Sequence, residues 1–138
     1  VHSYGRVLQN RVIANDQRRS TKLEIVGGAL FNLAFENAIA TDYVTEKFYD
    51  ALIAGSVPVV LGAPNVGEFA PADPSYVDVS DFPSPADLAS FLVALAGVEP
   101  RYAKYLAWKS GGFRPAFRDM LASVEVDPWT RLARRLAG

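Results

Sequence analysis

A run of polar residues between positions 36 and 47 is the part of this 138-residue sequence best equipped for chemistry. The polar side chains are Glu36, Asn37, Thr41, Asp42, Tyr43, Thr45, Glu46 and Lys47. The spacing places Lys47 near the first turn of a helix, where its charge opposes the helix dipole by roughly 0.3–1 kcal/mol. The free N–H groups of a helix start attract anions. A bound phosphate would satisfy both the lysine and the helix, so the pattern indicates an anion site.

Three neighbours of Lys47 carry groups that suit a sugar ligand. An ionised Glu46 accepts hydrogen bonds from sugar hydroxyls, and Tyr43 offers a flat ring and a hydroxyl. Asn37 offers both donors and acceptors at the end of a strand. A simpler alternative is an ordinary helix start, in which the acids and Thr45 are N-terminal helix residues and Lys47 is solvated. Spacing alone favours this simpler alternative.

Two apolar segments must position the polar run. Residues 30–35 alternate apolar side chains as a strand does, and residues 57–61 form a second apolar run. Between them, apolar residues recur at helical spacing at Val44, Phe48, Ala51 and Leu52. Thr41 or Asp42 would cap this helix, and Gly55 would end it. Strand, helix and strand in this order predict a βαβ unit with parallel strands, and such sheets bind ligands at the carboxyl ends of their strands.

The rest of the chain extends this unit into one layered α/β domain, residues 1–138. We expect a loop with at most a short strand in residues 1–22, and a turn in residues 23–30. A further loop should follow in residues 65–75, and residues 76–79 indicate a third strand. These are too few strands for a complete doubly wound sheet, so we expect half of a larger assembly.

Helices should fill the second half of the chain. Ser84 followed by Pro85 and Asp87 is a typical helix start, with a hydroxyl cap, a proline at the first position and an acid in the first turn. Another helix should begin at Pro100. A last helical pattern follows, with apolar residues at Phe117, Met120, Leu121 and Val124.

Composition excludes several classes of function. Fourteen Lys and Arg against 15 Asp and Glu provide no basic footprint for nucleic acid. The chain has no cysteine, which excludes disulfides, thiol nucleophiles and the usual zinc clusters, and its single histidine is His2. No phosphate-loop motif and no Asp-x-Asp pair is present, so nothing in the sequence demands a divalent metal. No apolar run approaches the ~20 residues of a membrane span. Residue 1 is not methionine, so we expect a piece of a longer protein.

The polar run and its flanking segments resemble the signature of the α1,3-fucosyltransferases. That family reads roughly F-x-L-x-F-E-N-x-x-x-x-D-Y-V-T-E-K and then A-L-x-x-G-x-V-P-V-V-x-G, whereas residues 31–65 read FNLAFENAIATDYVTEKFYDALIAGSVPVVLGAPN. SYGRVLQNR at 3–11 is similar to S-Y-G-x-C-x-x-N-R, and YAKYLAWK at 102–109 to Y-x-x-Y-x-x-W-[KR]. NVGEFAP at 65–71 resembles plant-type members that modify the N-glycan core. The resemblance covers about residues 1–112.

The resemblance implies an inverting glycosyltransferase that uses GDP-fucose and has two Rossmann-like domains, the GT-B arrangement. This chain would be the C-terminal, donor-binding half, a Rossmann-like parallel sheet flanked by helices. The matching donor-binding positions are Asn37, Tyr43, Thr45, Glu46 and Lys47. By this resemblance Lys47 would neutralise the diphosphate, Glu46 would hold ribose or fucose hydroxyls, and Thr45 would order the helix start. Glu36 would support the loop rather than act as a base.

Three departures from the family pattern limit what this chain would do alone. Val7 replaces a common cysteine, and Ala38 replaces a frequent serine. The N-terminal acceptor domain, which carries the general base, is missing, so we expect no catalytic residue in this chain. The resemblance further implies transfer to GlcNAc of an N-glycan or glycoprotein, on the lumenal side of the Golgi membrane, with no metal cofactor required. Core and Lewis-type acceptors stay open.

Two alternatives remain at this point. One is a catalytically incomplete fragment or pseudoenzyme that binds a GDP-sugar without transferring it. The other is a GT-B transferase that uses a different nucleotide sugar, such as a UDP-sugar.

Overall fold

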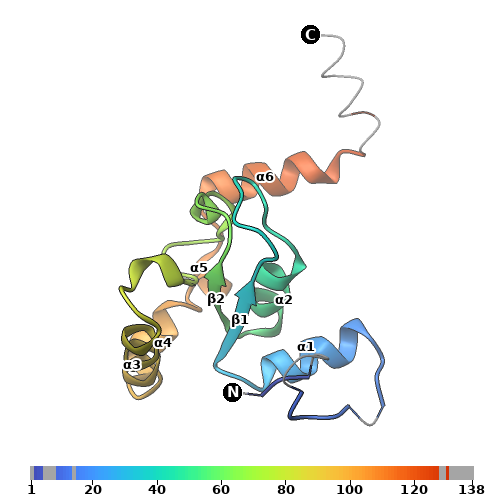
Figure 1. Ribbon diagram of the computed structural model, residues 1–138. Helices are drawn as coiled ribbons and strands as arrows, with labels where there is room; N and C mark the ends of the chain where they lie inside the picture. Colours follow the sequence, from blue (N-terminus) through green and yellow to red (C-terminus); the bar gives the residue numbers. More distant parts are fainter. Residues whose placement is uncertain (1, 5–8, 14, 128–129, 131–138) are drawn as a thin grey trace.

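A three-stranded parallel sheet forms the centre of the molecule (Figure 1). The computed structural model describes residues 2–4, 9–13, 15–127 and 130. Strands β1 (Phe31–Phe35), β2 (Val57–Leu61) and β3 (Val77–Asp78) lie in the order β1-β2-β3. The register pairs Phe31 with Val57 and Val59 with Val77. The predicted parallel βαβ unit is confirmed, and so is the α/β fold class.

The central strand β2 is apolar because both of its faces are covered. Its first four residues are all buried, as expected for a parallel strand between two layers of helices. Pro58 is accommodated because it interrupts no pairing. The N–H of Val57 donates to Leu30 O at 2.9 Å on the β1 side, and the β3 side is paired only from Val59 onward.

Helix α2 (Glu46–Ala54) covers one face of the sheet. Phe48 and Leu52 are buried in a cluster with Ala34 of β1 and Val60 of β2, and Val44 packs against its border. The helix ends at Gly55, whose φ of 91° is the left-handed conformation that favours glycine. The predicted apolar face and the predicted end of this helix are confirmed.

The predicted cap of α2 is wrong. Thr45, rather than Thr41 or Asp42, precedes the helix, and its hydroxyl accepts a hydrogen bond from the N–H of Lys47 at 3.4 Å. Asp42 has a φ of 64°, so it belongs to a tight turn instead of a helix entrance. Several capping residue types stand in this stretch, and only the backbone conformation decides which of them caps the helix.

Helix α3 (Pro85–Ala96) covers the other face of the sheet, opposite α2 (Figure 1). Leu88 and Leu95 are buried with Val57, Val59 and Val77. The predicted start is confirmed, because the Ser84 hydroxyl accepts from the Asp87 N–H at 3.2 Å and donates to the Asp87 carboxylate at 2.6 Å.

Helix α4 (Glu99–Lys104), which follows α3, contacts the beginning of the first strand. The Tyr102 hydroxyl donates to Leu30 O at 2.7 Å, and the Tyr102 ring meets Phe31 edge to face at 5.6 Å between centroids. A residue 72 positions later in the chain thus holds the beginning of β1.

Residues 19–27, predicted as loop and turn, instead form helix α1 (Arg19–Gly27). The sequence of this helix has no clear apolar stripe of the kind that predicts a helix, and Val26 is its one buried residue. Tertiary contacts stabilise it instead: Arg19 and Lys22 both bind Asp50 of α2, at 3.0 and 2.8 Å. Gly27 lies so close to α2 that a Cβ there would be 2.9 Å from Ala54 O.

Four further elements lie in the described part of the chain. They are the 3-10 turns η1 (Val66–Phe69) and η2 (Val79–Asp81) and the helices α5 (Trp108–Gly111) and α6 (Pro115–Glu125). The predicted third strand is therefore shorter than residues 76–79, because the chain turns at Val79, and η1 interrupts the predicted loop at 65–75. The apolar face of α6 holds only near its start, where Phe117 is buried and packs on Phe113 at 5.1 Å, whereas Val124 is 55% exposed.

Within the described ranges, no helix combines the length and the apolar character that crossing a membrane requires. Val7, the predicted departure from a family cysteine, lies outside the described residues.

Candidate functional site

Two loops meet at the carboxyl edge of the sheet. The first connects Glu36 at the end of β1 to Thr45 at the start of α2, and the second follows β2. The Asp42 N–H donates to Asn65 Oδ1 at 3.0 Å, and Asn65 Nδ2 donates back to Asp42 Oδ1 at 2.8 Å. This reciprocal pair fastens the tip of the first loop to the second. It also holds Asp42 in the left-handed conformation, which aspartate tolerates better than most residues.

The side chain of Glu36 lies beneath the first loop and is only 3% exposed. Its Oε1 accepts from the Thr45 N–H and from the Thr45 hydroxyl, both at 2.8 Å. Its Oε2 accepts from Lys47 Nζ at 2.9 Å. The backbone of Glu36 is held as well, because its N–H donates to Leu61 O at 2.8 Å. The expectation that Glu36 supports the loop agrees with these contacts.

Close packing leaves Glu36 little freedom. Gly62, just after β2, faces the Glu36 side chain so closely that a Cβ at position 62 would lie 2.8 Å from Glu36 Cγ and 3.2 Å from its Cβ. The glycine at position 62 therefore leaves room for the aliphatic part of the Glu36 side chain, which a larger residue would displace.

The two charges of the Glu36–Lys47 pair stabilise each other. Burial raises the pKa of Glu36, but hydrogen bonds from Lys47 and Thr45 outweigh it, so this pKa lies below its ordinary value. The hydrogen bond to Glu36 raises the pKa of Lys47, and the negative charge of Glu46 acts in the same direction. Both partners are therefore ionised at neutral pH.

Lys47 is paired and partly buried, so the alternative of a freely solvated lysine is wrong. Its side chain is 30% exposed. Nζ donates to Glu36, and it lies 3.4 Å from the Thr45 hydroxyl. An ammonium group has three N–H donors, so at least one remains available to a ligand. That donor lies at the N-terminal end of α2, where the helix dipole also favours an anion.

The structure brings only part of the predicted set together. Thr45 and Lys47 share a network with Glu36, whereas the side chains of Asn37, Tyr43 and Glu46 are exposed around it. Tyr43 is 38% exposed. The exposed side chains are therefore accessible to a ligand that approaches the carboxyl edge of the sheet.

Sequence reasoning missed Asn65 and Gly62. Asn65 contacts a residue 23 positions earlier, and Gly62 matters because of a side chain that packs on it from another strand. The local signal for both residues was a turn after a strand, which predicts a loop but no contact across it.

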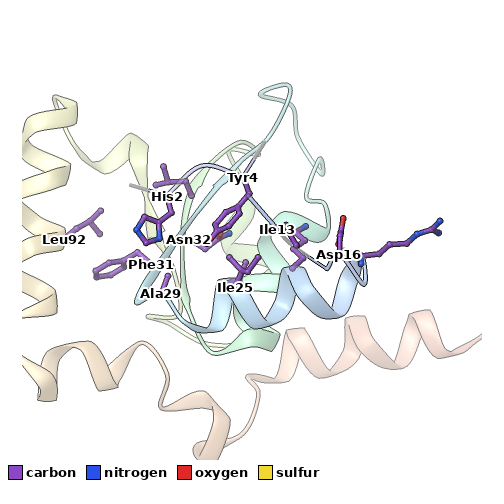
Figure 2. A pocket seen from close by; sticks show the side chains of 13 residues that line it. His2, Tyr4, Ile13, Asp16, Ile25, Ala29, Phe31, Asn32 and Leu92 are labelled. Carbon is purple, nitrogen blue, oxygen red and sulfur yellow. Dashed lines mark hydrogen bonds between the residues drawn. The ribbon is translucent and has the colours of Figure 1, made fainter. Parts of the chain in front are cut away.

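Two hollows lie near this region. One of about 360 Å³ is lined by Asn65, Tyr76 and Arg114, with Glu68 and Asp73 at its border, and it adjoins the second loop. The larger one, about 690 Å³, lies between α1, β1 and Leu92 of α3 and is lined largely by apolar side chains such as Ile25 and Phe31 (Figure 2). Lys47 lines neither of these two hollows.

Comparison with known proteins gives a consistent result. A family model described as glycosyltransferase family 10 (fucosyltransferase), C-terminal part, matches residues 1–136. A fucosyltransferase-like protein of Arabidopsis thaliana is 37% identical over 137 residues, which cover 99% of this chain and 26% of that protein. The GDP-fucose protein O-fucosyltransferase 3 of Mus musculus is 37% identical over 118 residues, covering 81% of this chain and 24% of that protein.

A solved structure agrees in fold. The crystal structure of an α1,3-fucosyltransferase with GDP-fucose aligns with a TM-score of 0.61 and 30% identity, covering 72% of this chain and 28% of that one. The chain therefore spans about a quarter of the length of the relatives that it matches.

Proposed function

The chain belongs to glycosyltransferase family 10, the fucosyltransferases, whose C-terminal part it matches, and from this membership we propose that it binds GDP-fucose for fucosyl transfer. The observation that carries the proposal is the ion pair between the buried Glu36 carboxylate and the partly exposed Lys47 at the N-terminal end of α2. The pair presents a fixed, ionised lysine at the carboxyl edge of a parallel sheet, where such folds bind ligands.

In this proposal Lys47 and the start of α2 neutralise the diphosphate of the donor. Negative charge grows on that diphosphate as GDP leaves, so a positive charge fixed beforehand stabilises the transition state more than the ground state. The charge comes from a lysine, so the proposal assigns no step to a divalent metal. Asn37, Tyr43 and Glu46 surround this point and would contact the nucleoside and the sugar hydroxyls.

Transfer with inversion needs a general base that deprotonates the acceptor hydroxyl as it attacks the anomeric carbon. We place that base outside this chain, in the acceptor-binding part of the full protein. The predicted absence of a catalytic residue here is therefore part of the proposal, as is the division of the protein into two halves.

For the acceptor, we propose GlcNAc of an N-glycan, in α1,3 linkage. The likeness to a solved α1,3-fucosyltransferase and the NVGEFAP segment support this choice. A second candidate is a protein hydroxyl, favoured by the relatives named protein O-fucosyltransferase 3. Full-length protein given GDP-fucose with a core N-glycan peptide or with a protein acceptor would distinguish the two by the product formed.

Location follows from the same family membership. We propose that the full protein works on the lumenal side of the Golgi membrane, where glycoproteins meet nucleotide sugars. Staining of the tagged protein away from a Golgi marker would contradict this.

The direct test of the donor role is Lys47→Ala in the full-length protein. We expect fucose transfer to fall by about 100-fold or more, the scale seen when one preorganised electrostatic contact is lost. GDP affinity, measured by calorimetry, should fall with it. Lys104→Ala, at an exposed lysine of α4, is the matched control and should change neither quantity.

Three results would contradict parts of the proposal. Unchanged transfer and affinity in Lys47→Ala would remove the assigned role of the lysine. Tighter binding of UDP than of GDP would replace the donor. Donor binding without transfer to any acceptor would instead favour a pseudoenzyme.

A further inference from the structure

A buried carboxylate stands directly behind the lysine that is proposed to meet a diphosphate. Glu36 carries a full negative charge close to where the negative ligand would bind, which by itself weakens anion binding. We propose that Glu36 is a positioning residue that aims Lys47 at the donor, and that this benefit exceeds its electrostatic disadvantage. This inference rests on the proposed function and goes beyond it, because it gives a role to a residue that need not touch the donor.

The first step of the argument is the geometry around Lys47. Among the described residues, the ammonium group donates to Glu36 Oε2 at 2.9 Å and to the Thr45 hydroxyl at 3.4 Å, and both acceptors lie at the base of the first loop. A lysine side chain with four rotatable bonds otherwise loses much freedom when a ligand orders it. Here the ordering is complete before the ligand arrives, so binding need not supply it.

The second step is the rigidity of Glu36. The N–H of Glu36 donates a hydrogen bond to Leu61 O, its Oε1 accepts one from the Thr45 N–H, and Gly62 packs against its Cγ. A carboxylate held on three sides fixes the position of whatever it binds. The orientation of Lys47 is therefore set by the sheet, through Glu36, rather than by the loop at the surface.

The third step separates positioning from simple loop support. A glutamine at position 36 has the same shape and could still accept from the Thr45 N–H through Oε1. Its amide nitrogen would then face Lys47 Nζ, and two donors cannot bond each other. Glu36→Gln thus keeps the loop contact and releases the lysine, which makes it a selective probe.

The charge of Lys47 provides a readout that a merely structural role would not move. The titratable groups that act on it are Glu36, Glu46 and Tyr43, and Glu36 makes the largest contribution to its raised pKa. With Glu36→Gln, the pKa of Lys47 should fall toward or below its ordinary value of 10.5. Lys47 would then lose its charge at a lower pH than the wild-type lysine does.

The experiment measures GDP affinity of full-length protein by calorimetry at pH 7.5 and pH 9.5, for wild type, Glu36→Gln and the exposed control Glu99→Gln. Glu36→Gln should bind GDP about tenfold more weakly at the lower pH. The ratio to wild type should widen at the higher pH, while Glu99→Gln follows wild type at both. Titration of guanine affects all three proteins equally and cancels in the ratio.

A second measurement covers the case in which Glu36→Gln does not fold. Isotope-labelled lysine in the wild-type protein allows NMR titration of Lys47 itself, which should give a pKa above 10.5. A pKa at or below that value overturns the positioning role, and so does a Glu36→Gln protein with unchanged GDP affinity or with an unchanged pKa of Lys47. Failure of wild type to bind GDP overturns the proposed function instead, and the lysine titration still decides whether Glu36 controls Lys47.

Discussion

Two buried carboxylates bind cations beside the same helix, at places with different consequences. Asp50, on α2, is 2% exposed and binds Arg19 and Lys22 of α1. Glu36, at the end of β1, is 3% exposed and binds Lys47 in the first turn of α2. Burial raises the pKa of each acid, and hydrogen bonds from the cations outweigh that effect in both, so both carboxyls stay ionised.

The two ion pairs differ in the position of their cations. Arg19 and Lys22 reach inward from a surface helix and join α1 to α2. Lys47 sits between its carboxylate and the open edge of the sheet, with a donor to spare. Similar ion pairs therefore serve a structural role where two helices meet and, in the proposed function, a binding role at the open edge of the sheet.

The largest expected effect comes from removing both cations of Asp50. Arg19→Ala with Lys22→Ala leaves a buried carboxylate without a partner, which should lower the free energy of unfolding by about 3 kcal/mol. Asp50→Asn leaves only exposed cations, which water can solvate, so its cost should be nearer 1 kcal/mol. Urea unfolding measures both.

Acid provides the control for that comparison. The folded-state pKa of Asp50 lies below its ordinary value of 3.8, so its stabilisation is present above pH 3.8 and is lost as pH falls through the folded pKa. Wild type should lose more stability than Asp50→Asn on acidification below about pH 4. Equal losses, or a double variant as stable as Asp50→Asn, would contradict the structural role.

A middle effect is expected at Gly62, where packing rather than charge holds Glu36. Gly62→Ala places a methyl group 2.8 Å from Glu36 Cγ, so the carboxylate must shift, and we expect a loss of about 1–2 kcal/mol together with weaker GDP binding. Gly97→Ala is the matched control, because its nearest neighbour lies 3.6 Å away. A loss of stability without any loss of GDP affinity would show that the packing of Gly62 on Glu36 does not affect the positioning of Lys47.

The smallest expected effect is at the clamp between the two loops. Asn65→Ala removes two hydrogen bonds to Asp42, which is exposed, so stability should fall by about 1 kcal/mol or less. The Michaelis constant for GDP-fucose should rise more clearly, since the clamp holds the loop that carries Tyr43. Steady-state kinetics at varied donor concentration tests this, and a change in kcat alone would contradict the role of the clamp in donor binding.

The sequence predicted what depends on local periodicity and little of what depends on distant partners. The strand β1, the helical spacing from Phe48 to Leu52 and the start at Ser84 each carry their signal within a few residues, and all three are confirmed. The alternation does not predict the buried face of β1, because Leu33 and Phe35 are exposed and Ala34 is buried. Helix α1 carries no such signal, because ion pairs to Asp50, 31 and 28 positions away, stabilise it in place of an apolar stripe.

The site divides in the same way. The types of residue near Lys47 indicated an anion site, and the structure places Thr45 and Lys47 together. The sequence analysis assigned Glu36, the partner of that lysine, only a general support of the loop. Glu36 and Lys47 are 11 positions apart, and the segment between them includes a turn whose path the sequence does not specify. The roles of Asn37, Tyr43 and Glu46 stay predictions.

The hydroxyl of Tyr102 has a consequence for the order in which this chain folds. Its bond to Leu30 closes a loop of 72 residues, and closing a flexible loop of that length costs about 4 kcal/mol of chain entropy. β1 and β2 close a much shorter loop, so they should pair first, with α4 docking late. During synthesis the amino end of β1 would then stay loosely held until the ribosome has released residues beyond position 102. Hydrogen exchange should find that same corner opening earliest in the finished protein.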